Sequence, residues 1–506
     1  MIAAMRDTGP SAMVAPRNVA IQLRSDMPDL LHDVAESIKR RTGARIHGYV
    51  ATREQLDHYA HRDERGTFAS LTVQNLALLA LDETLPPMAD IMAAARRHEA
   101  RLGVTYNHVA LTNRHLGRGY ALLGPCHPRS RYSERATYAH LVHGYNRVFE
   151  FWLGEVRERK IDLFLATGKE IAVVARAEGI PYRGLYGARY KNLHFWGDDE
   201  YRGSSRIWAR YADLSKARRA ASVDLEAPYD LARINHKLAL KDAALHRAAY
   251  FIGRQVARHA YWRLRGYEKG RGYYLGDEVR LLWRRYREWN KLTGRNMASL
   301  SSLRNHPFVF FPLQTEPETS IQQGSPEHFY QHAAIAALSR DLPAGVLLAV
   351  KETPYGVGRR PHGFYRQLRD IKNVVLLDIT VPGFEAVRQS MAVATLVGTA
   401  GFEAAVMGKP VISFGRHNIY GCLPHVFVVT DEGVLAGQIK CALDPAFSHD
   451  LARDEGRRLL QAIVDCSFNL GAYSYRVKSG HDAAIVESCV NNLFASLAEA
   501  ADVEVA

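Results

Sequence analysis

Short apolar runs alternate with longer amphipathic stretches in both halves of the chain, and this alternation predicts an α/β fold. In the first half, strands are expected at 18–23, 46–50, 162–166 and 182–185, with helices at 29–40 and 170–178. After residue 305 the rhythm is more regular, and strands are expected at 308–312, 346–350, 374–377, 393–397, 410–414 and 426–429. Strands that alternate with helices in this way form parallel sheets, so two Rossmann-like sheets are predicted.

The middle of the chain has a different pattern. Between 213 and 289, Ala, Leu, Arg and Lys dominate and turn signals are few, which predicts helices. The expected organisation is an N-terminal Rossmann-like domain at 1–215, a helical basic segment at 216–304, a C-terminal Rossmann-like domain at 305–470, and a last helical segment at 471–506. Two facing α/β domains leave a cleft, and ligands of such sheets bind at the carboxyl ends of the strands.

Composition excludes several classes of protein. Among 506 residues, 47% are hydrophobic and 24% are charged, which is ordinary for a folded protein and excludes wholesale disorder. No apolar run approaches the roughly 18 residues of a membrane span, and the N-terminus lacks a secretory pattern, so a cytoplasmic protein is expected. The five cysteines have no CxxC spacing and are expected to be free thiols.

The net charge of +13 is concentrated in one region. Between 254 and 304 the sequence has 13 Lys and Arg against 4 Asp and Glu, with aromatic residues such as Tyr261, Trp262 and Trp283 among them. Aromatic side chains mixed with cations are typical of a membrane interface and, less favoured here, of nucleic-acid binding. Two interpretations of 254–304 remain open: an arginine-faced helix whose aromatic residues are core, and contact with the inner face of the inner membrane. No nucleic acid is expected.

Gly398, Thr399, Ala400 and Gly401 join an expected strand directly to a helix. Small residues allow close approach of a ligand, and an uncapped helix N-terminus offers N–H donors to an anion. We therefore expect these residues to bind a phosphate or diphosphate, with Glu403 in the first helical turn to cap the helix or bind a ribose. A tight turn without a ligand is the alternative.

Three further loops follow expected strands of the second half. Their candidate residues are Lys351, Glu352, Arg359 and Arg360 in the second loop, Gln314, Glu316 and Glu318 in the third, and His417 and Tyr420 in the fourth. Arginine can bind phosphate bidentately, and a carboxylate can act as base, nucleophile or sugar ligand. If the strands are parallel in one sheet, all four loops lie at one edge.

The first half of the chain contributes fewer candidates. Asp26, just after the first expected strand, is a candidate base facing the cleft. Arg114, His115 and Arg118 lie in one loop and are candidates for binding an acceptor. A surface loop is the alternative for these three residues. No carboxylate pair stands at a strand end in metal-binding spacing, so no required metal is expected.

Four stretches of the second half resemble the capsule polysaccharide biosynthesis family, which contains Kdo transferases and is similar in architecture to GT-B glycosyltransferases. These stretches are Phe308–Glu318, Val350–Pro354, Asn373–Leu377 and Gly398–Ile412, within residues 305–425. The resemblance implies a GT-B-like pair of domains and transfer of a sugar from a nucleotide-activated donor, possible donors being CMP- or UDP-linked. It implies that the domain at 1–215 binds the acceptor, that the domain at 305–470 binds the nucleotide sugar, and that the last helix at 471–506 packs back on the first domain. It also places Gln314, Lys351, Glu352, Thr399 and Gly401 at the family's donor motifs.

The resemblance has departures. Thr353 stands where the family usually has His, so Arg359 or Arg360 is expected to contact the donor phosphate, and Glu318 stands where Kdo transferases tend to have Asp. The expected function is a metal-independent glycosyltransferase, of hexosyl or Kdo type, that acts on a capsule or lipopolysaccharide glycan or glycolipid and needs no cofactor. The alternatives are a nucleotide-sugar epimerase, a CDP-alditol phosphotransferase, and a non-catalytic membrane-surface protein that binds glycan or lipid.

Overall fold

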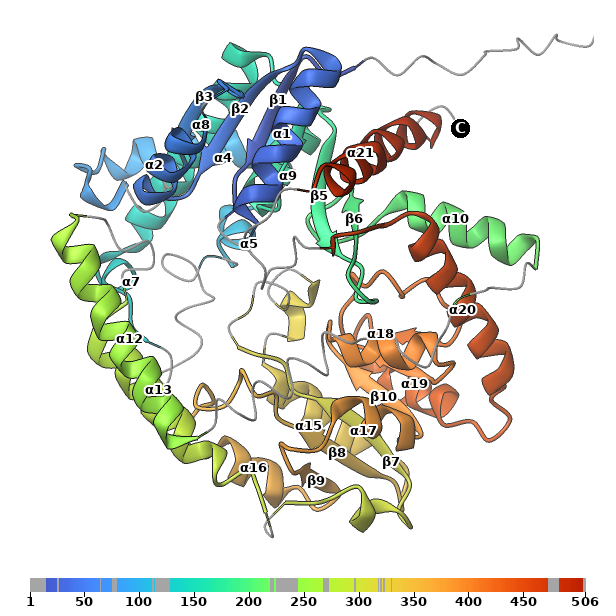
Figure 1. Cartoon of the computed structure of the whole chain (residues 1–506). Coiled ribbons are helices and arrows are strands. Elements are labelled where there is room, and N and C mark those ends of the chain that lie inside the picture. The colour runs from blue at the N-terminus through green and yellow to red at the C-terminus, as the bar shows by residue number, and fades with distance from the viewer. Residues whose placement is uncertain are drawn as a thin grey trace, which may run out of the picture.

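The chain forms two α/β halves, one above the other in Figure 1. The computed structural model describes residues 15–24, 27–63, 65–74, 80–111, 113, 128–218, 223, 244–266, 273–294, 297–316, 318, 321, 324–328, 330–471 and 482–503. Each half has one sheet, and the sheets contain seven and six strands. The predicted fold class, two Rossmann-like α/β domains with a helical segment between them, is confirmed.

The N-terminal sheet has the strand order β13-β6-β5-β4-β1-β2-β3. Its strands are β1 Asn18–Gln22, β2 Arg45–Val50, β3 Phe68–Val73, β4 Leu163–Leu165, β5 Tyr182–Gly187, β6 Leu193–Gly197 and β13 Phe468–Asn469. The strands from β5 to β3 are parallel, whereas β6 and β13 pair antiparallel. Sequence analysis missed β3, β6 and β13, because an edge strand, a hairpin return and a two-residue strand leave little hydrophobic pattern.

The C-terminal sheet has the order β12-β11-β10-β7-β8-β9, and all of its pairs are parallel. Its strands are β7 Phe308–Pro312, β8 Leu347–Lys351, β9 Val374–Leu377, β10 Ala392–Thr395, β11 Val411–Ser413 and β12 Val426–Val428. Continuous apolar strands such as β7 are buried on both faces of a parallel sheet, which is why the pattern was readable from the sequence.

Helices cover both sheets (Figure 1). Those of the N-terminal half are α1 Pro28–Thr42, α2 Arg53–Arg62, α4 Met88–Leu102, α5 Tyr106–Ala110, α7 Arg131–Arg135, α8 Tyr138–Arg159, α9 Lys169–Ala177 and α10 Ser205–Lys216. The remaining helices are α12 Leu245–Leu264, α13 Leu275–Trp289, α15 Gln331–Asp341, α16 Phe364–Asp370, α17 Gly383–Gln389, α18 Thr399–Val406, α19 Leu435–Ala442, α20 His449–Asp465 and α21 Ala483–Val503. Single-turn 3-10 helices lie at Ala80–Asp82, Ser301–Leu303, Pro326–His328 and Glu432–Val434.

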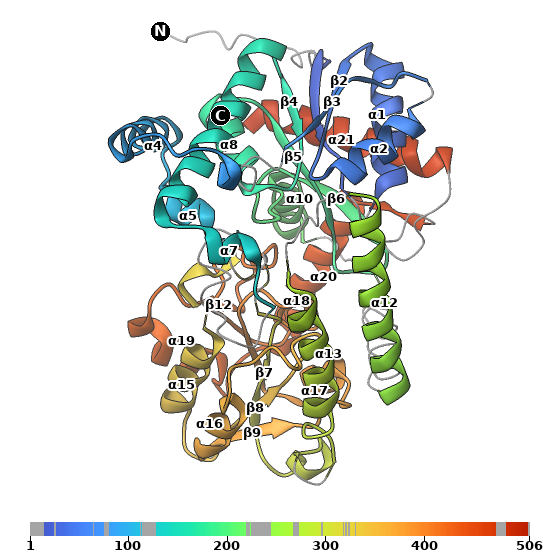
Figure 2. The ribbon, with the colours of Figure 1, turned by 90° about the vertical axis from the view of Figure 1, so that its left-hand side faces the viewer.

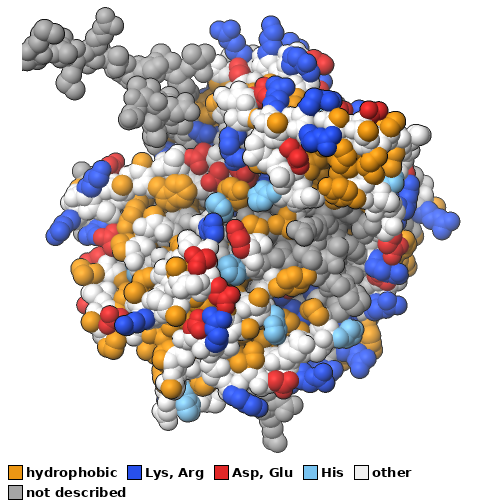
Figure 3. Space-filling model, turned by 180° about the vertical axis from the view of Figure 1, so that it is seen from behind, with side chains coloured by type: hydrophobic (Ala, Val, Ile, Leu, Met, Phe, Trp, Pro, Cys, Tyr) orange, Lys and Arg blue, Asp and Glu red, His pale blue; other side chains and the backbone are white. Residues whose placement is uncertain are grey.

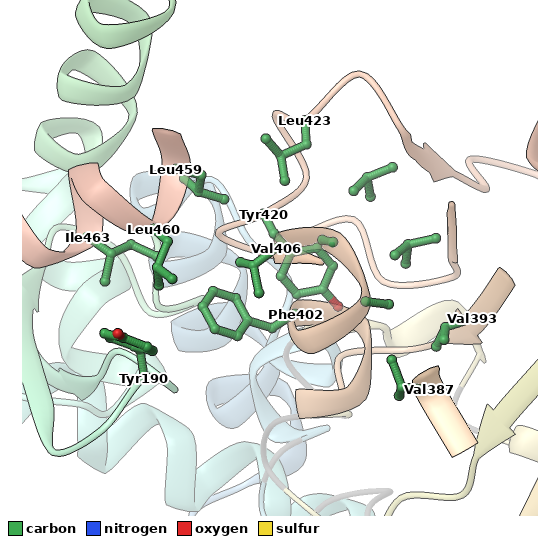
Figure 4. Packing of buried hydrophobic residues seen from close by; sticks show 14 of the residues in the cluster. Tyr190, Val387, Val393, Phe402, Val406, Tyr420, Leu423, Leu459, Leu460 and Ile463 are labelled. Carbon is green, nitrogen blue, oxygen red and sulfur yellow. The ribbon is translucent and has the colours of Figure 1, made fainter. Parts of the chain in front are cut away.

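A shared apolar core joins the two halves on one side of the molecule. Tyr190 of the N-terminal half packs in the same cluster as Phe402 of α18 and Leu460 and Ile463 of α20 (Figure 4). Trp208 Nε1 also donates to the Ile419 carbonyl, 3.0 Å away. Because this contact is a packed core, it holds the carboxyl ends of the two sheets in a defined relation.

The chain crosses between the halves again at its end. After α20 the chain adds β13 to the edge of the N-terminal sheet, and α21 lies against α1. Ser37 of α1 donates to Glu487 of α21, and Trp196 Nε1 donates to the Cys489 carbonyl at 3.0 Å. The last helix is therefore part of the N-terminal half.

Helix α13 spans the two halves on the opposite side (Figures 1 and 2). Near its start, Asp277 Oδ2 accepts from Arg129 Nε of the N-terminal half at 2.8 Å. Near its end, Arg284 Nη2 donates to the Arg360 carbonyl at 2.6 Å, and Glu288 accepts from the Gly358 N–H at 3.0 Å. Helix α12 packs on α13 and forms the outer edge.

Among the described residues, no helix is long and apolar enough to cross a membrane. The four described cysteines, Cys422, Cys441, Cys466 and Cys489, are free thiols, as predicted.

Candidate functional site

The four candidate loops of the second half lie at one edge of the C-terminal sheet. Their strands β11, β10, β7 and β8 are adjacent and parallel, so the loops that follow them emerge side by side. Gln314, after β7, accepts from the Val397 and Gly398 N–H groups at 2.9 and 2.7 Å when its amide oxygen faces them. Asn418, after β11, donates to the Leu396 carbonyl at 3.1 Å. The predicted convergence of the loops is present in the structure.

Helix α18 presents its N-terminus at this edge. Its N-cap is Gly398, and no side chain caps the helix. Thr399 and Ala400 are partly exposed, and among the described residues their backbone N–H groups have no hydrogen-bond acceptor. Unpaired N–H groups and the positive end of the helix dipole suit a phosphate or another anion.

The small residues of this turn have a role that differs from the prediction. A Cβ added at Gly401 would lie 2.4 Å from Tyr420 Oη and 2.5 Å from Thr395 Cγ2. Gly401 is therefore required because any side chain at this position would clash with Tyr420. Thr399 and Ala400 are the residues at which a ligand can approach the end of the helix.

Tyr420 is inside the protein, which corrects its predicted role at a ligand, and Glu403 is buried as well. Tyr420 is fully buried beside Phe402 (Figure 4), and Glu403 is 5% exposed. Burial raises the pKa of Tyr420 to about 12. Tyr420 packs in the apolar cluster that contains Phe402 and Leu460, so its side chain does not reach a ligand in this conformation. The role predicted for Glu403 stays a prediction.

Arg360, Glu352 and Glu316 form a buried ion cluster and do not line the site, which is a second correction. Arg360 Nε and Nη2 contact the Glu352 carboxylate at 2.7 and 2.9 Å, and Arg360 Nη1 contacts Glu316 at 2.9 Å. Tyr365 also donates to Glu352 at 2.8 Å. Burial opposes the charge of Arg360, but the two carboxylates raise its pKa above the ordinary value.

This cluster fixes the loops that carry it. Arg360 Nη2 donates to the Gln314 carbonyl at 2.6 Å, and Gln331 donates to Glu316 at 2.6 Å. Since Gln314 binds the turn before α18, the cluster is linked to that turn through one residue. Glu352, Glu316 and Arg360 therefore position the loops.

Lys351 and Arg359 flank this cluster. Lys351 is 7% exposed at the end of β8, and its Nζ donates to the Glu352 carbonyl at 3.3 Å. Burial lowers its pKa to about 8, although Glu352 and Asp378 act in the opposite direction. Arg359 is half-buried in the same loop.

Glu318 is the predicted carboxylate that keeps access to the site. It is half-buried in the loop after β7 and interacts electrostatically with Arg202 of the N-terminal half. The other predicted catalytic residue, Asp26, lies outside the described residues, as do the predicted acceptor residues Arg114, His115 and Arg118.

Sequence analysis missed two arginines of the N-terminal half that face the C-terminal loops. Arg189 Nη1 donates to the Gly398 carbonyl, 3.0 Å away, and Arg202 interacts with Arg189, Glu318 and Arg24. Arg202 is exposed to solvent, yet the surrounding protein and Arg189 lower its pKa. Arg202 is therefore a solvent-exposed cation that lies close to Arg189, to Glu318 and to other protein groups.

Backbone strain marks both arginines. Their φ angles are 60° at Arg189 and 69° at Arg202, in the left-handed region that non-glycine residues avoid. Such strain is held in place by the surrounding structure and is concentrated at functional sites. Arg189 follows a strand that the sequence predicts, and this position could have marked it as a candidate. It was missed because the antiparallel pairing of β6 with β5 was not predicted.

His417 lies at the contact between the halves. Its ring stacks on Tyr201, with centroids 3.8 Å apart and an interplanar angle of 12°. Partial desolvation lowers the pKa of His417. The side chain is exposed on its other face, so the prediction that it stacks on a base or sugar stays open.

The space-filling view shows charged and histidine side chains gathered across the middle of one face (Figure 3).

Among the described residues, one group of potential metal ligands is close enough to bind an ion: His32, Asp33 and Glu36 in α1. Arg62 lies 3.6 Å from Asp33 and Arg65 lies 2.7 Å from Glu36, so arginines already compensate both carboxylates.

Comparison with known proteins identifies a family over part of the chain. Residues 217–422, which are 206 of the 506 residues, match the family described as capsule polysaccharide biosynthesis protein. The resemblance drawn from residues 305–425 is confirmed over the shared stretch. No curated protein matches the chain.

Several solved structures are similar at low identity. The KpsC beta Kdo 2,7 transferase of Thermosulfurimonas dismutans is 14% identical, covers 60% of this chain and 74% of its own, and has a TM-score of 0.28. The UDP-GlcNAc 2-epimerase of Methanocaldococcus jannaschii, solved with UDP-GlcNAc and UDP, is 9% identical, covers 88% and 99%, and has a TM-score of 0.28. The glycosyltransferase SnogD of Streptomyces nogalater is 12% identical, covers 89% and 95%, and has a TM-score of 0.24. TM-scores of this size carry no argument about the function of this chain.

Proposed function

We propose that this protein is a glycosyltransferase of capsule or related surface-polysaccharide synthesis, which transfers a sugar from a nucleotide-activated donor. The observation that carries the proposal is the uncapped N-terminus of α18, faced by Arg189 and Arg202 of the other half, with Glu318 nearby. An anion-binding helix end and two cations beside one accessible carboxylate match the needs of this reaction. The family match over residues 217–422 agrees with it.

The leaving nucleotide develops negative charge on its phosphate as the glycosidic bond breaks. The Thr399 and Ala400 N–H groups can donate hydrogen bonds to this phosphate at the end of α18, and the guanidinium of Arg202 can add a positive charge from the other half. These groups are held in place before the reaction, so they stabilise the transition state without reorganisation. We propose that this charge stabilisation needs no metal and no cofactor.

The acceptor hydroxyl must lose a proton when it attacks the sugar. Glu318 is a candidate to take this proton, because its carboxylate is half-buried and lies close enough to Arg202 to interact with it electrostatically. Asp26, after β1, is the second candidate for this role, and Arg114, His115 and Arg118 remain candidates for holding the acceptor. We place the reaction in the cytoplasm at the inner face of the inner membrane, with a glycan or glycolipid as acceptor.

Substitution of Ala400 tests the anion site directly. Isothermal calorimetry with CMP, UDP, GDP and dTDP is expected to show binding of one nucleotide to the unmodified protein and to Ala400→Gln. Ala400→Glu places a carboxylate of nearly the same size at the helix end and is expected to weaken that binding by at least about tenfold. Equal affinities for the two variants, or no heat with any nucleotide, contradict the proposal.

Product analysis separates the transferase from the other enzyme classes. The protein is incubated with a nucleotide sugar that carries the base of the nucleotide bound in calorimetry, and with a lipid-linked or oligosaccharide acceptor. This reaction is expected to give a longer glycan and free nucleotide. An epimerised donor without transfer indicates the epimerase, and phosphate retained in the product indicates the phosphotransferase.

A further inference from the structure

The outer face of α12 is exposed, cationic and apolar at once. In this 20-residue helix, which is about 30 Å long, Ala248 is the buried residue, and α12 packs on α13. The outward positions recur at helical spacing, at Tyr250, Arg254, Ala257, Tyr261 and Leu264. Leu264 is 86% exposed and the two tyrosines are about half exposed.

No acidic residue interrupts this face. The sequence of α12 contains four arginines and no Asp or Glu. The acidic residues of α13 are occupied elsewhere: Asp277 binds Arg129, Glu278 accepts from Gln255 and contacts His259 of α12, and Glu288 binds Arg284 and the Gly358 N–H. Among the described residues of α12 and α13, the acidic side chains are thus paired within the protein, whereas Arg254 and Arg263 of α12 are exposed.

We propose that the outer face of α12, formed by Tyr250, Arg254, Ala257, Tyr261 and Leu264, binds the surface of an anionic lipid bilayer. Aromatic and leucine side chains along the middle of the face enter the boundary between headgroups and acyl chains. Arginines beside them, such as Arg258 stacked 4.2 Å above the Trp262 ring, pair with lipid phosphates. Charge complementarity is what selects this occupant.

Two other occupants fit the face less well. A second copy of the chain would set arginines against arginines, because α12 has no carboxylate to offer. Nucleic acid would use the arginines but would leave Leu264 and the exposed side chain of Val256 against a polar phosphate backbone. A bilayer surface uses both the cations and the apolar side chains.

The proposal can be tested with the full-length protein and sedimented vesicles. We expect binding to vesicles of equal parts phosphatidylcholine and phosphatidylglycerol, and at least about tenfold weaker binding to phosphatidylcholine alone. The double variant Tyr261→Ser with Leu264→Ser is expected to lose about tenfold in partitioning at all salt concentrations, because it removes apolar contact. Arg254→Gln with Arg263→Gln is expected to lose binding chiefly at low salt.

A matched control changes the same residue types elsewhere. Tyr138→Ser with Leu451→Ser removes an exposed tyrosine of α8 and an exposed leucine of α20, and it is expected to bind vesicles like the unmodified protein. Equal binding of the α12 double variants and the control overturns the proposal. Salt-sensitive binding to duplex DNA, or a dimer, that the α12 variants abolish while vesicle binding persists also overturns it. Nucleotide calorimetry on the same variants is expected to be unchanged, which separates this proposal from the proposed enzymatic function.

Discussion

Arginines occupy two contrasting environments around the candidate site. Arg360 is 1% exposed and is enclosed by the carboxylates of Glu316 and Glu352. Arg202 is exposed, lies beside the like charge of Arg189, and has the half-buried Glu318 as its nearby carboxylate. A basic loop in the sequence therefore does not identify a ligand-binding cation. Arg360, whose charge is balanced by two carboxylates, holds the loops in place. Arg202, which lies beside another arginine, can bind an anionic ligand.

The two environments also differ in the backbone. Arg360 follows a turn that folds back on β8, so its side chain returns to a carboxylate eight residues earlier. Arg202 has a φ of 69°, a conformation that costs about 1–2 kcal/mol for a residue with a Cβ. A cluster built for stability has no need of such strain, whereas a binding site can retain it to aim a side chain.

The largest expected effect is loss of the buried cation. Arg360→Met leaves Glu316 and Glu352 buried without their counter-charge, so we expect a loss of about 3–5 kcal/mol in the free energy of unfolding. Urea unfolding of the variant measures this loss. The exposed Arg304 provides the control, since Arg304→Met is expected to change stability by less than about 0.5 kcal/mol. A change below about 1 kcal/mol for Arg360→Met would show that the cluster does not hold the loops.

The next effect concerns Lys351, which lies beside the same cluster. Its pKa of about 8 in the folded protein is below the ordinary lysine value of about 10.4, so between these values the unfolded chain binds more protons than the folded one. Stability contributed by Lys351 therefore rises as the pH increases through this window. Relative to Lys351→Met, the unmodified protein is expected to gain about 2 kcal/mol of unfolding free energy between pH 7 and pH 10.

Urea unfolding at the two pH values measures this difference. Lys351→Leu provides a second neutral side chain, and the same pH-dependent gain is expected against it. A difference that is constant with pH would mean that Lys351 is not desolvated.

A smaller effect is expected at the exposed arginine, and on binding instead of stability. Arg202→Asn removes the charge while Asn tolerates the left-handed backbone, so stability is expected to stay within about 1 kcal/mol of the unmodified protein. Affinity for the nucleotide that binds best is expected to fall about tenfold, which is about 1.4 kcal/mol. Calorimetry measures the affinity, and Arg202→Lys is expected to recover part of it. Unchanged affinity would remove Arg202 from the site.

The smallest effect tests the correction at Tyr420. Its hydroxyl is buried, and among the described residues it has no hydrogen-bond partner. Tyr420→Phe is therefore expected to raise the free energy of unfolding by up to about 1 kcal/mol and to leave nucleotide affinity unchanged. Thermal unfolding and calorimetry on the same sample give both values. A loss of affinity would restore the role in donor binding that the sequence suggested.

The sequence was most informative where strands are continuous and apolar. Strands β7 and β9 have the predicted bounds, because a strand that is buried on both faces of a parallel sheet is an unbroken run of hydrophobic residues in the sequence. That regularity also predicted that the loops carrying Gln314 and Gly398 meet at one edge. Short or antiparallel strands such as β6 and β13 leave no such run, so the contact that brings Arg189 to the Gly398 carbonyl was not foreseen.

The roles of individual side chains depended on distances that no local pattern encodes. Arg360 and Arg202 are the same residue type in the sequence, yet folding surrounds Arg360 with two carboxylates and leaves Arg202 exposed beside Arg189. Alternation and turn residues are local signals that settle the class of fold and the edge at which ligands bind. Whether a charge is neutralised depends on long-range packing, because pairing energies act between residues that only the folded chain brings together.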